Sequence, residues 1–130
     1  MNVKQCILAT SIITLTHIAF AEPAPKSIDL NKLYGKFEKS GYSTLELMDT
    51  TKQVLISGTV LDVSQSFSGS SILKIGAHAN SQELARLTAG DDAQENKLKL
   101  LKIGSNVKAI CDLGFSSGTQ YIPFQDCVFK

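Results

Sequence analysis

The side chains able to do chemistry in this chain are few and widely spaced. Its cysteines are Cys6, Cys111 and Cys127, and its histidines are His17 and His78. A cysteine nucleophile works with a neighbouring base that a third group orients, and a structural zinc ion takes four ligands. The spacing of these residues favours neither arrangement. Two cysteines in an oxidising compartment more simply form a disulfide.

The first 21 residues predict such a compartment. Lys4 gives a positively charged start, and residues 6–18 form a mostly apolar run that is short for a membrane span. Ala19-Phe20-Ala21 then has the small-x-small pattern of a cleavage site. We therefore expect a Sec-type signal peptide over residues 1–21 and a periplasmic or secreted mature protein, rather than a buried N-terminal helix.

Removal of that segment changes the length, the net charge and the number of cysteines of the mature chain. Of 130 residues 109 remain, a length typical of one domain. Lys4 is the only charged residue among the first 21, so 12 of the 13 basic residues remain beside 12 acidic ones. A chain with a net charge near zero lacks the summed positive field of a strong phosphate-backbone binder. Cys6 also leaves, so Cys111 and Cys127 remain as a pair.

An amphipathic helix is expected ahead of the main domain, within a leader-and-helix segment of residues 22–50. Its apolar side chains recur at i, i+3, i+4 and i+7, with lysines on the other face. Those apolar positions are Leu30, Leu33, Tyr34 and Phe37. Ser27 or Asp29 is a candidate cap for its start, and Gly41 is a candidate stop. We expect the apolar face to pack on a core.

Strands are expected from residue 54 onwards. Residues 54–63 place apolar side chains on both faces, and Gly58 among them indicates a bend or a bulge. A turn rich in serine and glycine leads into a second strand over residues 71–77, which makes a hairpin. The segment 82–88 fits a strand and a helical turn equally well.

Acidic residues precede a second helical pattern. Asp92 stands three residues before Glu95, in the arrangement of a capping box, with Asp91 beside them. Calcium binding or paired catalytic carboxylates are the alternative uses, but no ligand-loop spacing accompanies these residues. The one concentrated basic run follows, at Lys97, Lys99, Lys102 and Lys108. We expect these lysines to form a solvated face, with a phosphate-contacting stripe as the alternative.

The last two strands carry the two cysteines of the mature chain. Residues 106–113 alternate between polar and apolar, and residues 121–129 return as a final strand after a glycine-serine turn. Pro123 indicates an edge or a bulge in that strand. Strands paired across this turn bring Cys111 opposite Cys127, within reach of a bond. We therefore predict a Cys111–Cys127 disulfide.

The expected elements follow the order of an OB-fold: a helix, a curled strand, a hairpin, a third element, a helix and two strands. We predict a mainly β chain with helices: a five-stranded Greek-key OB-fold barrel over residues 51–130, preceded by the amphipathic helix. The strings VLISGTVLDV, ILKIG, LKIGSNVKAICDL and YIPFQDCVF resemble the tRNA-anti-like OB-fold family of small secreted bacterial proteins. The positions that carry the resemblance are residues 54–60, residues 102–111 and Asp126-Cys127. The resemblance implies an architecture rather than an activity.

OB-folds bind ligands on the face of their second and third strands and in the loops joining strands 1–2 and 4–5. We expect those loops at residues 64–70 and 114–120, which contain the related strings FSG and FSSG. Phe67 and Phe115 would form an aromatic platform at one rim, to stack a base or sugar ring or to anchor a protein. The alternative, which is the commoner use of such residues, is that they fold back over the open end of the barrel. The candidate ligand-binding residues are Phe67, Ser68, Lys74, Phe115, Ser116 and Tyr121.

These features together favour a binding module. We expect an exported domain without catalysis, cofactor or metal, which contacts a protein or an oligosaccharide-type polymer of the cell envelope. The alternatives are a structural or inhibitory protein acting on a secreted enzyme or envelope complex, and a weak single-stranded nucleic-acid binder. An enzyme is disfavoured because His78 has no clustered partners for acid–base chemistry.

Overall fold

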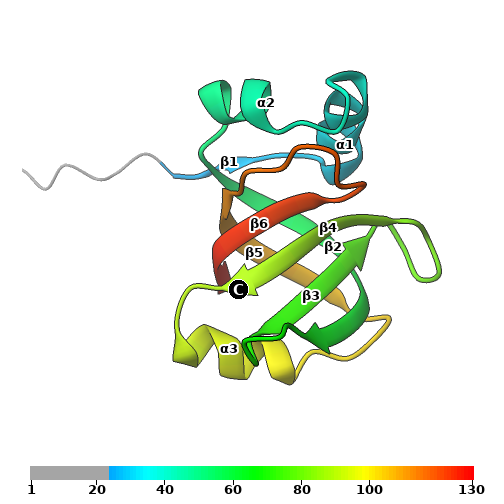
Figure 1. The fold of residues 1–130 in the computed structure, drawn as a ribbon. Coiled ribbons are helices and arrows are strands. Elements are labelled where there is room, and N and C mark those ends of the chain that lie inside the picture. Colours follow the sequence, from blue (N-terminus) through cyan, green and yellow to red (C-terminus); the bar gives the residue numbers. More distant parts are fainter. Residues whose placement is uncertain (1–23) are drawn as a thin grey trace, which may run out of the picture.

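A computed structural model describes residues 24–130, so the predicted signal peptide lies outside the described residues (Figure 1). In chain order the elements are β1 (Lys26–Ser27), α1 (Leu30–Lys39), α2 (Leu45–Thr50), β2 (Gln53–Gln65), β3 (Ser71–Gly76), β4 (Glu83–Ala89), α3 (Asp92–Lys99), β5 (Asn106–Leu113) and β6 (Ile122–Phe129). Among these residues, no helix has the length and apolar character needed to cross a membrane.

Five of the strands close into a barrel. The sheet runs β2-β3-β4-β6-β5, and β5 pairs back with β2 to complete the circle. All of these neighbours are antiparallel except β4 and β6, which are parallel, and α3 joins the third barrel strand to the fourth. This is the Greek-key topology of an OB-fold. The predicted fold class is confirmed, and the ambiguous segment 82–88 belongs to strand β4.

The long strand β2 changes partners halfway along. Its residues 53–59 pair with β5 and its residues 59–65 pair with β3. Gly58 lies at the changeover, where an added Cβ would stand 3.1 Å from the Gly76 carbonyl oxygen. Without a side chain there, the two backbones can approach at the bend. The irregularity expected at Gly58 lies slightly further along β2, where the register with β3 shifts between Val60 and Asp62.

A bulge in β6 determines where Cys127 points. Three residues of β5, 110–112, face four residues of β6, 125–128, so Asp126 and Cys127 together stand opposite Cys111. Asp126 has a φ of 52°, in the left-handed region. The extra residue shifts the alternation of the strand, so that Cys127 faces the interior. The bulge that Pro123 led us to expect is present, three residues further on.

The predicted disulfide joins Cys111 to Cys127, and both cysteines are fully buried. A structural disulfide of this kind is typical of extracytoplasmic proteins. Pro123 does not mark an edge strand, because β6 pairs with β4 on one side and with β5 on the other.

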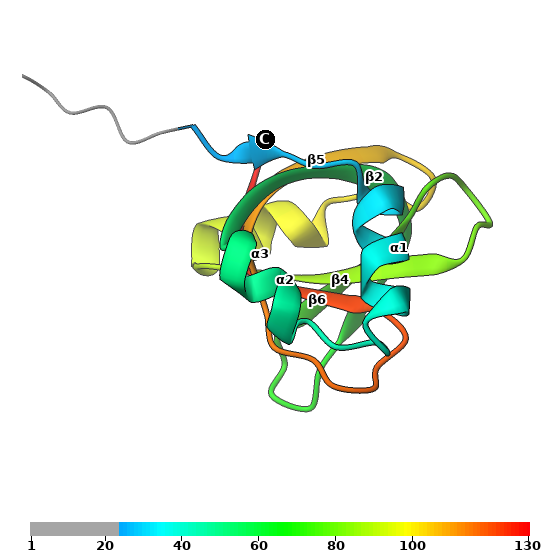
Figure 2. The same cartoon turned by 90° about the horizontal axis from the view of Figure 1, so that it is seen from above.

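Helices cover the two ends of the barrel (Figures 1 and 2). Helix α1 lies over one end and buries the four predicted apolar side chains in the same core as the strands, and α2 lies beside it. The α1 cap is Asp29, whose carboxylate accepts a hydrogen bond from the Lys32 N–H at 3.1 Å. Gly41 follows the helix with a φ of 72°, as expected for a stop. Helix α3 lies over the opposite end of the barrel.

The predicted capping box at the start of α3 is wrong in detail. The cap is Asp91, one residue earlier, whose carboxylate accepts from the Gln94 N–H at 2.8 Å. Glu95 does not reach back to the cap. Its carboxylate accepts a hydrogen bond from the Ser71 N–H at 2.7 Å and so joins α3 to the start of β3. Hydrogen bonds from Ser71 and the positive charge of Lys99 lower the pKa of Glu95.

The lowered pKa of Glu95 predicts that Glu95→Gln loses stability to an extent that depends on pH. The pKa of Glu95 is lower in the folded than in the unfolded chain, where it is about 4.3. The ionised carboxylate therefore contributes its full stabilisation above the unfolded pKa. This stabilisation is lost as the pH falls through the folded pKa. We expect Glu95→Gln to lower the free energy of unfolding by about 1 kcal/mol at neutral pH and by much less at pH 3. Urea denaturation at both pH values measures this. Glu38→Gln, on the exposed face of α1, is the control; an equal loss in Glu95→Gln at both pH values would contradict the assignment.

Candidate ligand-binding face

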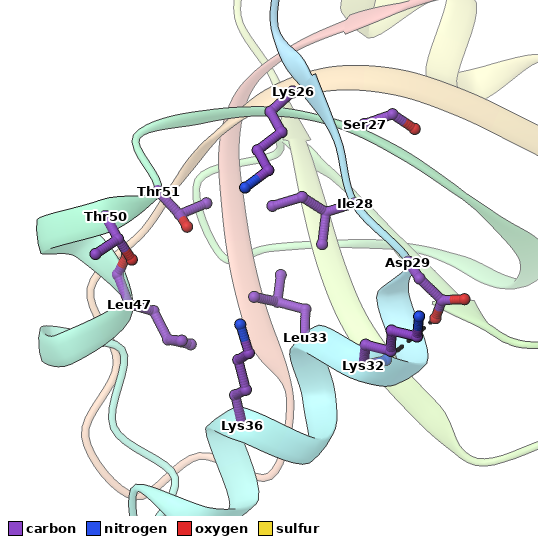
Figure 3. Close-up of a pocket in the computed structure, with 10 residues that line it drawn as sticks. All are labelled: Lys26, Ser27, Ile28, Asp29, Lys32, Leu33, Lys36, Leu47, Thr50 and Thr51. Carbon is purple, nitrogen blue, oxygen red and sulfur yellow. Dashed lines mark hydrogen bonds between the residues drawn. The ribbon is translucent and has the colours of Figure 1, made fainter.

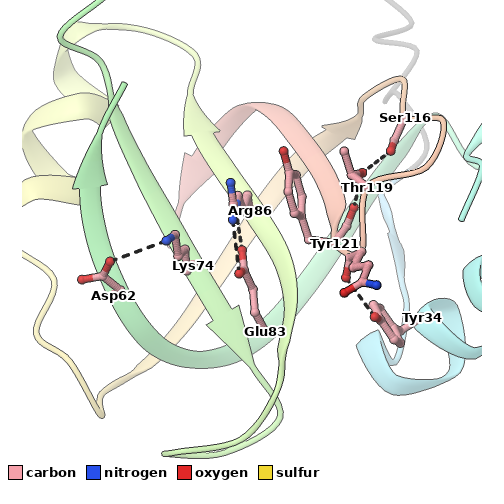
Figure 4. A network of polar contacts seen from close by, with 9 residues as sticks. Tyr34, Asp62, Lys74, Glu83, Arg86, Ser116, Thr119 and Tyr121 are labelled. Carbon is pink, nitrogen blue, oxygen red and sulfur yellow. Dashed lines mark hydrogen bonds and ion pairs between the residues drawn. The ribbon is translucent and has the colours of Figure 1, made fainter. Parts of the chain in front are cut away.

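The outer side of β2, β3 and β4 carries a row of charged residues. Asp62, Lys74 and Arg86 are direct partners across the three strands, and the register continues from Arg86 to Pro123 on β6. Figure 4 shows these side chains on one side of the sheet, followed by Tyr121. We call this surface the Arg86 face. It corresponds to the second and third barrel strands, where OB-folds bind their ligands.

Arg86 is held between two partners. Its guanidinium makes two hydrogen bonds to the Glu83 carboxylate, and its central carbon lies 3.9 Å from the centroid of the Tyr121 ring. The hydrogen bonds with Glu83 raise the pKa of Arg86, so the group stays charged. A planar guanidinium stacked on an aromatic ring is positioned more rigidly than a lysine would be. The face therefore has an ordered centre.

The charges on the Arg86 face are compensated. Lys74 Nζ lies 3.9 Å from a carboxylate oxygen of Asp62, beside the Arg86–Glu83 pair. The four side chains are 27–48% exposed, so donors and acceptors of both kinds remain open to a ligand. Two cations balanced by two carboxylates leave these four side chains without the net positive charge that attracts a chain of phosphates.

The two predicted binding loops flank this face from opposite ends. The turn between β2 and β3 lies beside α3, where its residues 68–70 share a hollow with Asp91, Asp92 and Glu95. The loop between β5 and β6 lies at the other end, against the α1–α2 connection (Figure 1). The single aromatic platform expected from Phe67 and Phe115 is therefore wrong. Because β2 and β5 are antiparallel neighbours, the loops that follow them lie at opposite ends, with the Arg86 face between them.

Both phenylalanines are exposed. Phe67 is fully exposed at the tip of its turn, and Phe115 is 64% exposed. The alternative expectation, that they fold back over the open barrel ends, is wrong because α1 and α3 already cover those ends. Each phenylalanine is free to contact a ligand that extends beyond the Arg86 face.

The two predicted serines differ in their environment. The Ser68 hydroxyl is exposed and lies 2.8 Å from the Ser66 hydroxyl. Ser116 is buried: its N–H donates to the Thr44 hydroxyl at 2.8 Å, and its own hydroxyl contacts Thr119. Its hydroxyl is thus committed inside the loop. We correct the prediction by assigning Ser116 to loop structure rather than to ligand contact.

Side chains from the helical end hold the loop between β5 and β6. The buried Thr44 hydroxyl donates to the Gly114 carbonyl at 2.9 Å while it accepts from the Ser116 N–H. The Tyr34 hydroxyl donates to the Gln120 carbonyl at 2.9 Å and accepts from Gln82 at 3.0 Å. Burial raises the pKa of Tyr34, so its hydroxyl stays protonated as the donor. The N-terminal helices therefore set the position of one border of the face.

The other predicted chemical groups lie away from this face. His78 is exposed in the turn between β3 and β4, and Cys111 and Cys127 are both in the disulfide. The four lysines of the basic run lie on α3, on the segment after it and on β5. Within residues 24–130, no group of three or more histidine, cysteine, aspartate or glutamate side chains is placed to hold a metal ion.

Sequence reasoning missed the residue at the centre of the face. Arg86 is the only arginine of the chain. It lies in the segment 82–88, whose pattern fitted a strand and a helical turn equally well. Leu84 and Leu87 are three residues apart, which is the spacing of one helix face. In the structure they lie on a strand, where a bulge between β3 and β4 buries the adjacent residues Leu84 and Ala85 together. Lys74 and Tyr121, two of the candidate ligand-binding residues, both lie on this face.

Comparison with known proteins supports the fold. No protein-family model matches the chain, and no curated protein matches it. The crystal structure of a "putative nucleic acid-binding lipoprotein" from Klebsiella pneumoniae superposes with a TM-score of 0.63 at 13% identity, covering 82% of this chain and 92% of that one. The two proteins share a fold. The structure of RecG bound to a three-way DNA junction matches with a TM-score of 0.43 at 17% identity, covering 61% of this chain and 11% of that chain.

Proposed function

We propose that this protein is a non-catalytic binding module of the cell envelope, periplasmic or secreted, that holds an oligosaccharide-type polymer across the Arg86 face. The observation that carries the proposal is the Arg86–Tyr121 stack, with its balanced charges, at the binding position of an OB-fold. Paired guanidinium and carboxylate groups offer donors and acceptors to sugar hydroxyls, and Tyr121 and Phe67 offer ring surfaces. The predicted signal peptide and the buried disulfide support the location, and the motifs support membership of the tRNA-anti-like family.

Single-stranded nucleic acid is the second candidate. The Klebsiella neighbour is named for nucleic-acid binding, and an arginine stacked on an aromatic ring can contact bases. The carboxylates of Asp62 and Glu83 weigh against it, because each stands beside a cation that would otherwise contact phosphate.

Binding assays with Arg86 variants test the proposal. Peptidoglycan fragments and fluorescent single-stranded oligonucleotides are titrated against the wild-type protein at low and at moderate salt. We expect fragment binding that changes little with salt. Arg86→Ala and Arg86→Lys are expected to weaken it about tenfold, since lysine keeps the charge but loses the stack and the two-point contact.

The control for these variants is Lys108→Ala, an exposed position on β5 outside the face. Oligonucleotide binding that is tighter than fragment binding and falls steeply with salt would favour the second candidate. Unchanged fragment binding in both Arg86 variants would remove the Arg86 face as the site.

A further inference from the structure

A concave surface lies away from the Arg86 face, between β1, α1 and α2. It has a volume of about 660 Å3, within the range of small-molecule sites. Figure 3 shows the side chains around it. No strand of the Arg86 face contributes to its lining.

The floor of this pocket is apolar. The side chains of Ile28, Leu33 and Leu47 point into it from β1's end, α1 and α2 respectively (Figure 3). Leu33 and Leu47 belong to the buried core, and Ile28 packs against that core while partly exposed. The floor is therefore held by the fold and presents hydrocarbon to the pocket.

The rim of the pocket is basic. The amino groups of Lys26 and Lys36 are directed into it from β1 and α1, and Lys32 also lines it. Asp29 is the one acidic lining residue, and its carboxylate caps α1. Within residues 24–130 no carboxylate lies within 4.0 Å of any of these three lysines, since the ion pairs there belong to Lys74, Arg86 and Lys99.

We propose that this pocket binds an amphipathic anion, a small molecule with a carboxylate or phosphate head and a short apolar body. The head lies between the ammonium groups of Lys26 and Lys36, where a negative charge relieves the repulsion between two cations. The body packs on Ile28, Leu33 and Leu47, where burial of hydrocarbon favours binding. The hydroxyl of Thr51 lines the same space and can donate a further hydrogen bond to the head, whereas that of Thr50 donates to the Leu47 carbonyl at 3.4 Å. This site is independent of the ligand proposed for the Arg86 face.

An NMR titration tests the proposal with defined probes. Decanoate and decyl phosphate are added below their critical micelle concentrations to methyl-labelled protein, and the methyl signals of Ile28, Leu33 and Leu47 are followed. We expect both probes to shift these three residues in a saturable way, and the tighter of the two identifies the head group. Decyl maltoside has the same body with a neutral head and is expected to bind at least tenfold more weakly.

Lysine variants test where the anionic head group of the probe binds. Lys26→Gln and Lys36→Gln are each expected to weaken decanoate binding about fivefold, while Lys39→Gln, on the same helix but outside the pocket, leaves it unchanged. These side chains are exposed, so the variants are expected to unfold at the same temperature as the wild type. The proposal is overturned if decyl maltoside binds as tightly as decanoate, if the Lys26→Gln/Lys36→Gln double variant binds like the wild type, or if the three methyl groups do not respond.

Discussion

Loss of the Cys111–Cys127 disulfide is expected to lower the free energy of unfolding by about 3 kcal/mol. The bond joins residues 16 apart in sequence, each near the C-terminal end of its strand, and its loss releases that constraint in the unfolded chain. A domain of this size typically has a total stability of about 5–15 kcal/mol, so the loss is a large share of it.

Two measurements examine this expectation. The double variant Cys111→Ala/Cys127→Ala is compared with the wild type by urea denaturation, on a chain that begins at Glu22 and so lacks Cys6. Because both cysteines are fully buried, a reductant should leave the native fold intact without urea and should lower the midpoint of unfolding when urea is present. Two alkylated thiols in the unreduced wild type, or equal midpoints with and without reductant, would contradict the assignment.

Thr44→Val is expected to lower the free energy of unfolding by about 2 kcal/mol and to loosen the loop between β5 and β6. Valine has nearly the same shape, but it leaves the Ser116 N–H and the Gly114 carbonyl without their buried partner. Unsatisfied buried groups of this kind cost about 1–3 kcal/mol each. Since this loop borders the Arg86 face, ligand binding there should weaken as well.

Amide hydrogen exchange at Ser116 separates this effect from general destabilisation. We expect exchange at Ser116 to become much faster in Thr44→Val, while amides in the centre of β2 change only with global stability. Thr44→Ser is the matched control, because it keeps the hydroxyl and loses only a methyl group. Unchanged Ser116 exchange in Thr44→Val would show that the hydroxyl does not hold the loop.

Local patterns predicted much of the fold because each depends on neighbours in sequence. The apolar stripe of α1 and the pairing of Cys111 with Cys127 are of this kind, and both are confirmed. Export of the mature chain and the absence of catalysis stay predictions, since the described residues do not test them.

The features that sequence reasoning missed depend on how distant segments meet. Leu84 and Leu87 have helical spacing, and only pairing with β3 makes that segment a strand that turns Arg86 outward. The two phenylalanine loops look alike in sequence, yet they follow β2 and β5, which run antiparallel to each other, and so they lie at opposite ends of the barrel. Ser116 resembles a loop serine, but its burial depends on Thr44, 72 positions away along the chain.

The bulge at Asp126 makes the last strand sensitive to backbone conformation at a single position. Deletion of Asp126 would leave three residues of β6 opposite three of β5, and regular alternation would still turn Cys127 and Phe129 inward. A β-branched residue at position 126 would instead disfavour the left-handed backbone, which has a φ of 52° there. In a regular strand that kept the extra residue, Cys127 and Phe129 would face solvent and Val128 would turn inward. Among chains that keep this disulfide, we therefore expect position 126 to hold Asp, Asn or Gly or to be deleted, while the side chain at position 125 varies.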